Sequence, residues 1–350
     1  MRILHVLETL AAGGVETTFL EVLKHLPRAG VSHDVLAFAG GALEPEFRAA
    51  ANVVIVEPRQ PALARLVTDR PYDIAHVLFE RCALRLLPDL LTRTSTRVVY
   101  GKNYDFSGQW RSTEGFIWAA DDALLAACDA VTFTTPQLAR AFPDAAARAT
   151  ILGKGANVRP LLGMPTPGPD VPNQVLVIAN PTPRKRLGDL VAALASVRLQ
   201  VPDATVRVVG AGDPNEVARL SAQAAAAGLQ DHFRLTGPTR NIAAALASCR
   251  VFALASGSEG VPTAALEAMA AARPVVTTDA GHVRSIVGDG VHGFVVPVGD
   301  IAALAERIGR LLEDRGLAAE MGVRARTRAT EHAVEHIATR LFAVLTQAAA

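Results

Sequence analysis

The sequence has few cysteines, nearly balanced charges and no long apolar run. Cys82, Cys128 and Cys249 are too few and too far apart for a disulfide framework or a zinc site, so we expect buried thiols in a reducing compartment. The formal net charge is +1, and no basic stripe is present that would neutralise a phosphate backbone. Nucleic acid is therefore not an expected partner, and the expected ligand is small.

Several sequence signals of membrane insertion and of common catalytic sites are also missing. No stretch approaches the length of a membrane span, and the apolar start of the chain meets Glu8 before a signal peptide would be complete, so we expect a cytoplasmic protein. There is no Asp-x-Asp, no helix motif of two histidines with a glutamate, and no Gly-x-Ser-x-Gly. The turn Gly210-Ala211-Gly212 lacks the third glycine of a dinucleotide fingerprint. We therefore expect no metal, no serine hydrolase and no nicotinamide cofactor.

The length and hydropathy pattern predict two α/β halves. The chain has 350 residues, half of them hydrophobic, which is long for one core and suits two. In the first half, buried strand patterns alternate with helical spacing, as in Val15 to Leu26 and Ala83 to Leu91, and this predicts a parallel sheet covered on both faces. The expected strands are Ile3 to Leu7, His33 to Phe38, Val53 to Val56, Asp73 to Val77, Arg97 to Tyr100 and Ala130 to Thr134.

A stretch with five prolines, 160–172, separates the two halves and predicts a stiff, extended linker at a domain boundary. The alternation of strands and helices then starts again. The expected elements are strands at Gln174 to Ala179, Thr205 to Val209, Phe233 to Thr236, Val251 to Ala255 and Pro274 to Thr278, and helices at Leu187 to Gln200, Pro214 to Ala227, Ala302 to Leu312 and Val334 to Leu345.

The run Ser256-Gly-Ser-Glu-Gly-Val-Pro-Thr-Ala-Ala-Leu-Glu267 is the most informative part of the sequence. Pro262 follows a strand and predicts a helix that begins beside it. The amides of Gly260, Val261, Thr263 and Ala264 then have no helical partner, and such a helix start suits a diphosphate. Glu267 lies one turn further on the same face, about 5.4 Å away, where its carboxylate would accept ribose hydroxyl protons.

Glu259 lies before this helix, on the opposite side of the expected phosphates, where it would bind the hydroxyls of a sugar. The alternative is that Glu259 and Glu267 are two solvated charges on an ordinary buried helix. The run, however, resembles the glutamate-x7-glutamate signature of retaining glycosyltransferases of family four, which have the GT-B fold. The likeness continues through 267–278, with Ala272 where the family usually has glycine.

This resemblance implies two doubly wound, Rossmann-like domains that face each other across a cleft. Residues 1–160 would bind the acceptor and residues 173–332 the nucleotide sugar, with 161–172 as the linker and hinge. The family's last helix crosses back onto the first domain, and we expect the same of residues 333–350. The resemblance also implies catalysis without a metal.

Further site residues follow from the same resemblance. Gly13 and Gly14 correspond to the family's glycine pair after the first strand, although a tight turn explains them equally well. Lys185 matches the family's lysine for the leaving diphosphate. The family's arginine near Asn180 is missing, and Arg184 or Arg186 would replace it; the alternative is that these basic residues cap a solvated helix start.

The first half departs from the family pattern. Asn103 stands closest to the position of a histidine that contacts the sugar, and asparagine can hydrogen-bond a hydroxyl but cannot take up a proton. Lys102 and Lys154 would replace lost phosphate contacts or bind an acidic acceptor, and as loop lysines their default place is solvent.

The sequence therefore predicts a retaining, metal-independent glycosyltransferase that moves a sugar from a nucleoside diphosphate sugar to an acceptor hydroxyl or amine. Two alternatives stay open: a sugar-nucleotide epimerase or hydrolase of the same fold, and a non-catalytic subunit that binds a nucleotide sugar. A cluster of arginines also leaves open a peripheral contact with the inner face of a membrane, the alternative being the solvated face of a core helix. These are Arg81, Arg85, Arg93 and Arg97.

Overall fold

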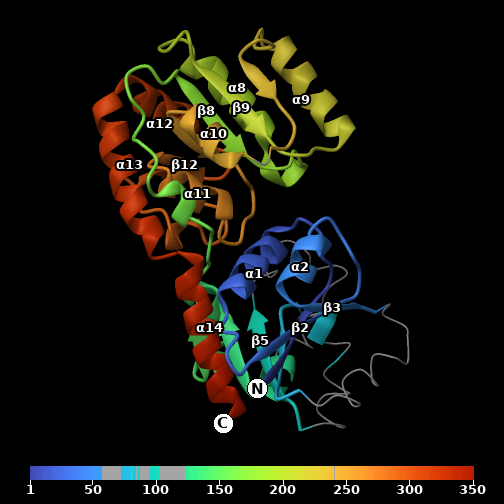
Figure 1. Cartoon of the computed structure of the whole chain (residues 1–350). Coiled ribbons are helices and arrows are strands. Elements are labelled where there is room, and N and C mark those ends of the chain that lie inside the picture. Colours follow the sequence, from blue (N-terminus) through green and yellow to red (C-terminus); the bar gives the residue numbers. More distant parts are fainter. Residues whose placement is uncertain (57–71, 80, 84–85, 87–94, 103–122, 240) are drawn as a thin grey trace. The chain divides into compact units, whose positions relative to one another are not determined.

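The computed structural model describes two compact units, drawn in Figure 1. The described residues are 1–56, 72–79, 81–83, 86, 95–102, 123–239 and 241–350. The first unit consists of Met1–Gly155 with Val334–Ala350, and the second of Ala156–Ala333. The C-terminal helix α14 (Val334–Ala349) belongs to the first unit, where it packs against α1 (Gly14–His25).

The first unit contains a parallel sheet of seven strands in the order β3-β2-β1-β4-β5-β6-β7. Its strands are β1 (Arg2–Leu7), β2 (Ser32–Ala37), β3 (Asn52–Ile55), β4 (Ile74–Val77), β5 (Arg97–Lys102), β6 (Ala130–Phe133) and β7 (Ala149–Ile151). Further helices of this unit are α2 (Glu44–Ala50), α6 (Pro136–Arg140) and α7 (Pro143–Ala146). Because all neighbouring strands in this sheet pair in parallel, the carboxyl ends of these strands meet at one edge of the sheet.

Two apolar clusters cover the two faces of this sheet. On one face, Phe19 of α1 and Leu341 of α14 pack with residues such as Ile3 of β1. On the other, Leu138 of α6 and Phe142 pack with alternate strand residues. The period-2 strand pattern buried on both sides is what the sequence predicts for a parallel sheet between helices.

The second unit contains a parallel sheet of six strands in the order β10-β9-β8-β11-β12-β13. Its strands are β8 (Gln174–Ile178), β9 (Thr205–Val209), β10 (Phe233–Leu235), β11 (Val251–Leu254), β12 (Val275–Thr278) and β13 (Gly293–Val296). Its helices are α8 (Leu187–Val197), α9 (Pro214–Ala226), α10 (Ile242–Ala247), α11 (Thr263–Ala270), α12 (Ile301–Glu313) and α13 (Arg315–Thr330), with one-turn helices η1 (Arg159–Leu161), η2 (Pro183–Lys185) and η3 (Val283–Ser285). The chain order reverses between β8 and β11, the position where doubly wound sheets bind ligands.

The predicted strands and long helices are confirmed to within a few residues, but the short helices α2, α6 and α7 were not predicted, and neither were β7, β13, α10 and α13. Strands β7 and β13 are short, and helix α10 is a six-residue run of mostly alanine whose periodicity is too short to recognise. Helix α13 mixes arginines with alanines and glycines around its circumference, so it carries no amphipathic signal. The predicted helix Ala83 to Leu91 lies mostly outside the described residues.

The proline-rich stretch 160–172 is part of the second unit, where the sequence predicted a separate extended linker. Its backbone carbonyls accept hydrogen bonds from arginines of that unit. Arg273 Nη1 donates to the carbonyl of Pro165 at 3.0 Å, and Arg315 Nη1 donates to that of Pro169 at 3.0 Å. Arg273 is 1% exposed. Proline has no backbone N–H, so a proline-rich stretch cannot join a sheet and its carbonyls lack strand partners. The two arginines donate to these carbonyls and so hold the stretch in place.

Within the described residues, no helix is both long enough and apolar enough to cross a membrane.

Candidate functional site

Helix α11 begins where the sequence predicts it, after the loop that follows β11. Strand β11 is fully buried and ends at Leu254. Helix α11 begins at Thr263, with Pro262 as its N-cap residue at φ −72° and ψ 111°. The proline ring fixes that φ, and its missing N–H costs nothing at a helix start. The predicted beginning of the helix is therefore confirmed to within one residue.

A second loop supports the backbone at Glu259. Gly281 has φ +60°, and a Cβ at this position would lie 1.6 Å from the carbonyl oxygen of Glu259. The amide of the next residue, His282, donates to the carbonyl of Gly260 at 3.2 Å. Only glycine allows both this φ and this close approach, so the loop after β12 sets the position of Glu259.

The backbone amides at the start of α11 form a group without intramolecular partners. In the part of the chain that the structure describes, no acceptor is recorded for the amides of Gly260, Val261, Thr263 and Ala264, while that of Ala265 donates to Pro262 O at 3.1 Å. This is the pattern predicted from the sequence. Free amides and the positive end of the helix dipole together favour an anion at this position.

Glu267 lies one turn into α11, on the same side as Thr263. Its carboxyl is half-buried, and no described residue donates a hydrogen bond to it. Burial raises the pKa of Glu267 to about 7. A carboxylate held near neutrality without a protein partner is typical of a functional group rather than of a solvated surface charge.

Helix α11 ends in a left-handed residue, Ala272, at φ +54°. The amide of Ala272 donates to Met269 O at 2.9 Å and that of Arg273 donates to Ala268 O at 2.9 Å, which is a Schellman motif. Glycine is the usual residue at this position because it has no Cβ to clash. The motif gives the physical reason why glycine is usual here. Ala272 adopts the left-handed conformation all the same, and both hydrogen bonds of the motif form.

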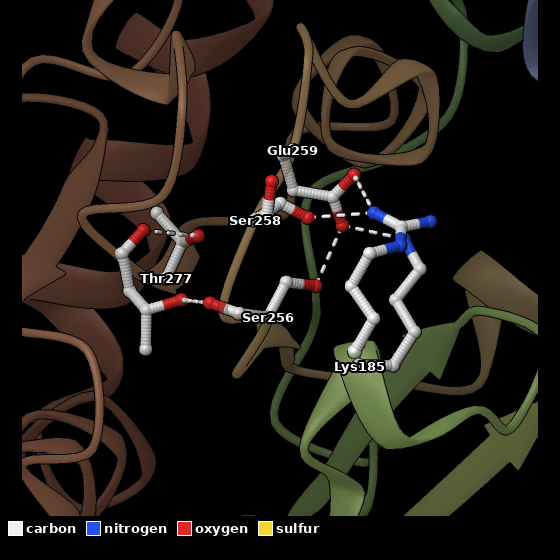
Figure 2. Close-up of polar contacts among 7 residues, drawn as sticks. Lys185, Ser256, Ser258, Glu259 and Thr277 are labelled. Atoms are coloured by element: carbon white, nitrogen blue, oxygen red, sulfur yellow. Dashed lines mark hydrogen bonds and ion pairs between the residues drawn. The ribbon is translucent and has the colours of Figure 1, made fainter. Parts of the chain in front are cut away.

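Charged and polar side chains surround the carboxylate of Glu259, as Figure 2 shows. Lys185 Nζ forms an ion pair with Oε1, and Arg184 Nη1 lies 3.4 Å from Oε2. Ser256 Oγ donates to Oε1 at 2.6 Å. The side chains of Lys185 and Glu259 are only 16% and 10% exposed, so this ion pair is far less screened than a surface pair.

Lys185 and Arg184 come from the loop after β8, which lies directly beside the loop after β11. The amide of Gly257 donates to Arg184 O at 2.8 Å, and Arg184 Nη1 donates to Ser258 O at 2.6 Å. Arg186 adopts φ +48° as the N-cap of α8 and pairs with Asp189 at 2.8 Å. These contacts join the two loops at the point where the chain order of the sheet reverses, so Glu259 and Lys185 are held by rigid backbone.

Asn180, the position where an arginine was missing, has a structural contact. Its Oδ1 accepts from the amide of Ala211 at 3.0 Å, which joins the loops after β8 and β9. A Cβ at Gly210 would lie 2.2 Å from the carbonyl oxygen of Ala179, so this glycine serves close backbone packing. Of the two arginines considered as replacements, Arg184 lies at Glu259 and Arg186 does not.

Ser256 and Thr278 also position the site, although the sequence does not predict a role for either. Thr278 Oγ1 donates to the carbonyl of Ser256 at 2.6 Å, and both residues are buried. Ser256 in turn donates to Glu259, so the end of β12 orients the loop through this serine. Ser256 belongs to the informative run, but only the register of β11 beside β12 brings Thr278 to it.

In the first unit, Gly13 and Gly14 stand at the start of α1, as predicted. A Cβ at Gly13 would lie 2.2 Å from Glu16 Oε2, whereas one at Gly14 would meet nothing within 4 Å. Lys154 Nζ donates to Gly14 O at 3.2 Å, and burial lowers the pKa of Lys154 to about 8. Asn103 lies outside the described residues.

The prediction that Lys102 is a solvated loop residue is wrong. It ends strand β5, is 1% exposed, and holds its ammonium 5.4 Å from the ring centroid of Phe142. The run of residues 97–102 continues the strand beyond the expected end at Tyr100, which places the lysine in the sheet. Its aliphatic stem packs in the core, and the aromatic ring faces the charge.

The basic residues considered for membrane contact are only partly described. Arg81 Nη1 lies 3.4 Å from Glu8, and Arg97 Nη1 lies 2.9 Å from Asp129. Both pair with carboxylates of the same unit, which is the pattern of a solvated face. The other two, Arg85 and Arg93, lie outside the described residues.

Two family models match the chain. Residues 166–328 match the model described as glycosyl transferases group 1, and residues 12–155 match that of Glycosyltransferase Family 4. Each match covers most of one unit and all of the elements that form its sheet except β1 in the first unit.

Curated relatives share part of this sequence. A phosphatidyl-myo-inositol mannosyltransferase of Mycobacterium leprae is 36% identical over 135 residues, which is 38% of this chain and 35% of the relative. A GDP-mannose-dependent phosphatidylinositol monomannoside mannosyltransferase of Mycolicibacterium smegmatis is 34% identical over 161 residues, 43% of this chain and 42% of the relative. The matches thus span well under half the length of these relatives.

Solved structures show the same fold over the whole chain. The HepE protein of Anabaena, solved with UDP and glucose, has a TM-score of 0.86 at 21% identity, and the match covers 99% of this chain and 100% of HepE. A sucrose-phosphate synthase of Thermosynechococcus elongatus has a TM-score of 0.82 at 20% identity, over 99% of this chain and 98% of that protein. The predicted α/β fold, two Rossmann-like units of the GT-B type, is confirmed.

Proposed function

Because the chain belongs to the glycosyltransferases of group 1 and family four, we propose that it transfers a sugar from a nucleoside diphosphate sugar to an acceptor hydroxyl or amine, with retention and without a metal. The observation that carries this proposal is the start of α11. Three features lie within residues 259–267. Among the described residues, they are backbone amides without acceptors, the carboxylate of Glu267 without a cationic partner, and the carboxylate of Glu259 paired with Lys185. No simpler structural role explains all three.

The diphosphate of the donor is assigned to the amides from Gly260 to Ala264. Two phosphates require several donors that converge, and a helix start provides them without side-chain entropy. The positive helix end also favours the charge that develops on the leaving oxygen as the sugar departs. Lys185 lies in the adjoining loop and adds a cation to the same region.

Lys185 and Glu259 form an ion pair with each other, and this gives both side chains a second role. The pair holds the lysine in place before the donor arrives, at little entropic cost on binding. A diphosphate beside Lys185 would share its ammonium with Glu259. The second oxygen of Glu259, Oε2, lies 3.4 Å from Arg184 Nη1 and has a further lone pair for a sugar hydroxyl. Arg184, more exposed at 52% of its side chain, would compensate part of the charge.

Glu267 is assigned to the ribose of the nucleotide. A ribose offers two adjacent hydroxyl donors, and a carboxylate accepts both. The carboxylate has no other donor among the described residues, and burial raises its pKa to about 7. Hydroxyl donors would stabilise the charged form and lower this pKa again, so nucleotide binding and ionisation of Glu267 are linked.

These assigned positions support the following reaction. The bond between the anomeric carbon and the diphosphate oxygen breaks, the acceptor oxygen or nitrogen forms the new bond on the same face, and the acceptor proton passes to the leaving phosphate oxygen. Glu259 is committed to the Lys185 pair and serves sugar hydroxyls in this scheme, so retention proceeds through an oxocarbenium-like transition state without a covalent enzyme intermediate.

The nucleotide base and the sugar are open to direct test. The relatives named above include a GDP-mannose-dependent enzyme, and a structural neighbour binds UDP and glucose. We would incubate the protein with GDP-mannose and with UDP-glucose in EDTA, with and without a panel of hydroxyl acceptors, and follow products by NMR. Transfer with an α-linked product supports the proposal.

The same assay separates the alternatives. Interconversion of the donor sugar without an acceptor would indicate an epimerase, and free sugar alone would indicate a hydrolase. Nucleotide binding without any turnover would indicate a non-catalytic subunit. Dependence on Mn²⁺ or Mg²⁺, abolished by EDTA, would contradict the metal-independent scheme.

A further inference from the structure

Three buried histidines form a hydrogen-bonded row across the first unit. His33, His5 and His76 lie on the adjacent strands β2, β1 and β4, on the face covered by α1 and α14, and are 4%, 0% and 2% exposed. His5 Nε2 lies 3.0 Å from His33 Nδ1, and His5 Nδ1 lies 3.1 Å from His76 Nδ1. No role in the proposed reaction uses this row.

The row is anchored at one end, and this fixes where each proton lies. His33 Nε2 lies 2.9 Å from the carbonyl oxygen of Pro27, which can only accept, so Nε2 carries the proton. A neutral His33 then accepts at Nδ1 from His5 Nε2–H. His5 Nδ1 in turn accepts from His76 Nδ1–H. His76 is therefore left with a lone pair on Nε2.

All three rings are neutral near pH 7. Burial is the largest cause that lowers the pKa of each, and that of His76 falls to about 4. The hydrogen bond to Pro27 and the charge of Asp34 oppose the lowering of the His33 pKa, while Arg28 adds to it at both His33 and His5. Among the described residues no group of three or more His, Cys, Asp or Glu side chains is arranged to hold a metal.

A pocket of about 60 Å³ lies beside His76, between the sheet and helices α1 and α14. Gly101 on β5 forms its floor: a Cβ there would lie 3.5 Å from both His76 Nε2 and Thr132 Oγ1. Thr132 is 3% exposed, and no other described residue hydrogen-bonds these two atoms. Phe19, Leu152 and Leu341 supply apolar walls.

The hydrogen-bonding groups that line this pocket favour one kind of ligand. His76 Nε2 accepts, so the group beside it must donate, and Thr132 Oγ1 can donate to the same group. A hydroxyl does both, whereas an anionic oxygen would face a lone pair. Of the two lysines that line the pocket, Lys154 donates from Nζ to Gly14 O, and Lys102 holds its ammonium over the ring of Phe142.

We propose that this pocket binds a small neutral alcohol or polyol, whose hydroxyl donates to His76 Nε2 and accepts from Thr132 Oγ1. A water needs at least ~10–15 Å³, so the volume suits a molecule of a few heavy atoms. The hydroxyl occupies the space that Gly101 leaves open, and the carbon atoms contact the apolar walls. This site lies wholly within the first unit and does not depend on the proposed transfer reaction.

Glycerol is the probe, and the imidazole nitrogens are the readout. Long-range ¹H–¹⁵N correlations of the full chain, assigned by single-histidine replacement, report the tautomer of each ring. We expect protons on His33 Nε2, His5 Nε2 and His76 Nδ1. Glycerol should shift His76 Nε2 saturably, and inorganic phosphate should leave it unmoved.

Two variants remove the site in different ways. Gly101→Ala places a methyl group at ordinary contact distance from both polar atoms and should abolish the glycerol shift. Thr132→Val keeps the side-chain shape, removes one hydrogen bond and should weaken glycerol binding about tenfold. Gly163→Ala, where a Cβ meets nothing within 4 Å, is the control and should bind as the original protein does.

Several results would overturn the proposal. A proton on His76 Nε2 would remove the acceptor on which it rests. Absence of a saturable glycerol shift, or a phosphate shift in its place, would exclude a site for neutral hydroxyls. Unchanged glycerol binding in Thr132→Val would show that glycerol binds elsewhere than in this pocket. This variant tests the proposal even if Gly101→Ala does not fold.

Discussion

The two units of this chain differ in what positions their polar side chains. In the second unit, backbone features hold Glu259: Pro262 starts a helix and Gly281 allows a close approach. In the first unit, a row of side chains, His33, His5 and His76, positions the polar atoms of a pocket. The backbone effects of proline and glycine can be predicted from the sequence, whereas contacts between side chains that are distant in the chain cannot.

The largest effect should come from the backbone contact at Gly281. Gly281→Ala adds a Cβ that would lie 1.6 Å from Glu259 O, at a φ of +60°. We expect a loss of about 2–5 kcal/mol in the free energy of unfolding, measured with urea, because strain at φ and overpacking add. Binding of nucleoside diphosphates should fall below detection.

Gly290→Ala is the matched control for that change. Gly290 has a similar φ of +72°, but a Cβ there would meet nothing within 4 Å. Only the cost of the left-handed conformation, about 1–2 kcal/mol, should remain. Equal losses in the two variants would show that the approach to Glu259 is unimportant.

The next effect concerns the cation beside the phosphates. Lys185→Gln removes a charge that is 16% exposed, and we expect nucleoside diphosphate affinity to fall at least tenfold, about 1.4 kcal/mol, in calorimetry. Arg184→Gln, with 52% of the side chain exposed, should cost less because solvent screens its charge. A larger loss for Arg184→Gln would reverse the assignment.

Glu267 should make binding depend on pH. Its pKa is raised to about 7, so the carboxylate that accepts ribose hydroxyls forms as the pH rises through 7, and affinity should rise with it. The ionisation of the diphosphate contributes to this slope as well. Glu267→Gln isolates the carboxylate's share, because the variant should retain only the ligand's part of the pH dependence.

The same group predicts an opposite effect on stability. Because the folded-state pKa exceeds the unfolded value of 4.5, the protein is stabilised by this group below pH 4.5 and loses that contribution as the pH rises to about 7. Glu267→Gln should therefore stabilise the free protein at pH 8, by on the order of 1–3 kcal/mol. Destabilisation at pH 8 would mean that an unseen partner compensates the charge.

The smallest effect should come from the hydrogen bond that orients Ser256. Thr278→Val removes a buried donor 2.6 Å from Ser256 O and should cost about 1–2 kcal/mol in urea unfolding, with a modest loss of affinity. Thr327→Val removes an exposed intrahelical bond of 3.3 Å and should change stability by less than about 0.5 kcal/mol.

These contrasts explain how much the sequence could predict. The long strands, the start of α11 and the pairing of Glu267 with a helix start follow from periodicity, Pro262 and spacing. The ion pair between Lys185 and Glu259 could not be predicted, because the two residues are 74 positions apart and meet only where the loops after β8 and β11 lie side by side. Each residue was assigned to the ligand, but their contact with each other was not foreseen.

Lys102 and the histidine row show the other limit. A lysine after a strand is usually solvated, and only the extra length of β5 and the ring of Phe142 bury this one. His5, His33 and His76 are far apart in sequence and meet because β2, β1 and β4 are neighbours in the sheet. Because the order of strands in a sheet is a tertiary property, a row of buried polar side chains cannot be predicted from the local sequence.

The start of α11 as a nucleotide site is the central claim, and calorimetric titration tests it most directly. GDP and UDP would each be titrated in EDTA into the original protein, into Glu267→Ala and into a surface control, Glu313→Ala on α12. We predict that one nucleotide binds, that Glu267→Ala weakens it at least tenfold, and that the control does not. Binding that is equally tight in Glu267→Ala, or no binding of either nucleotide, would contradict the assignment.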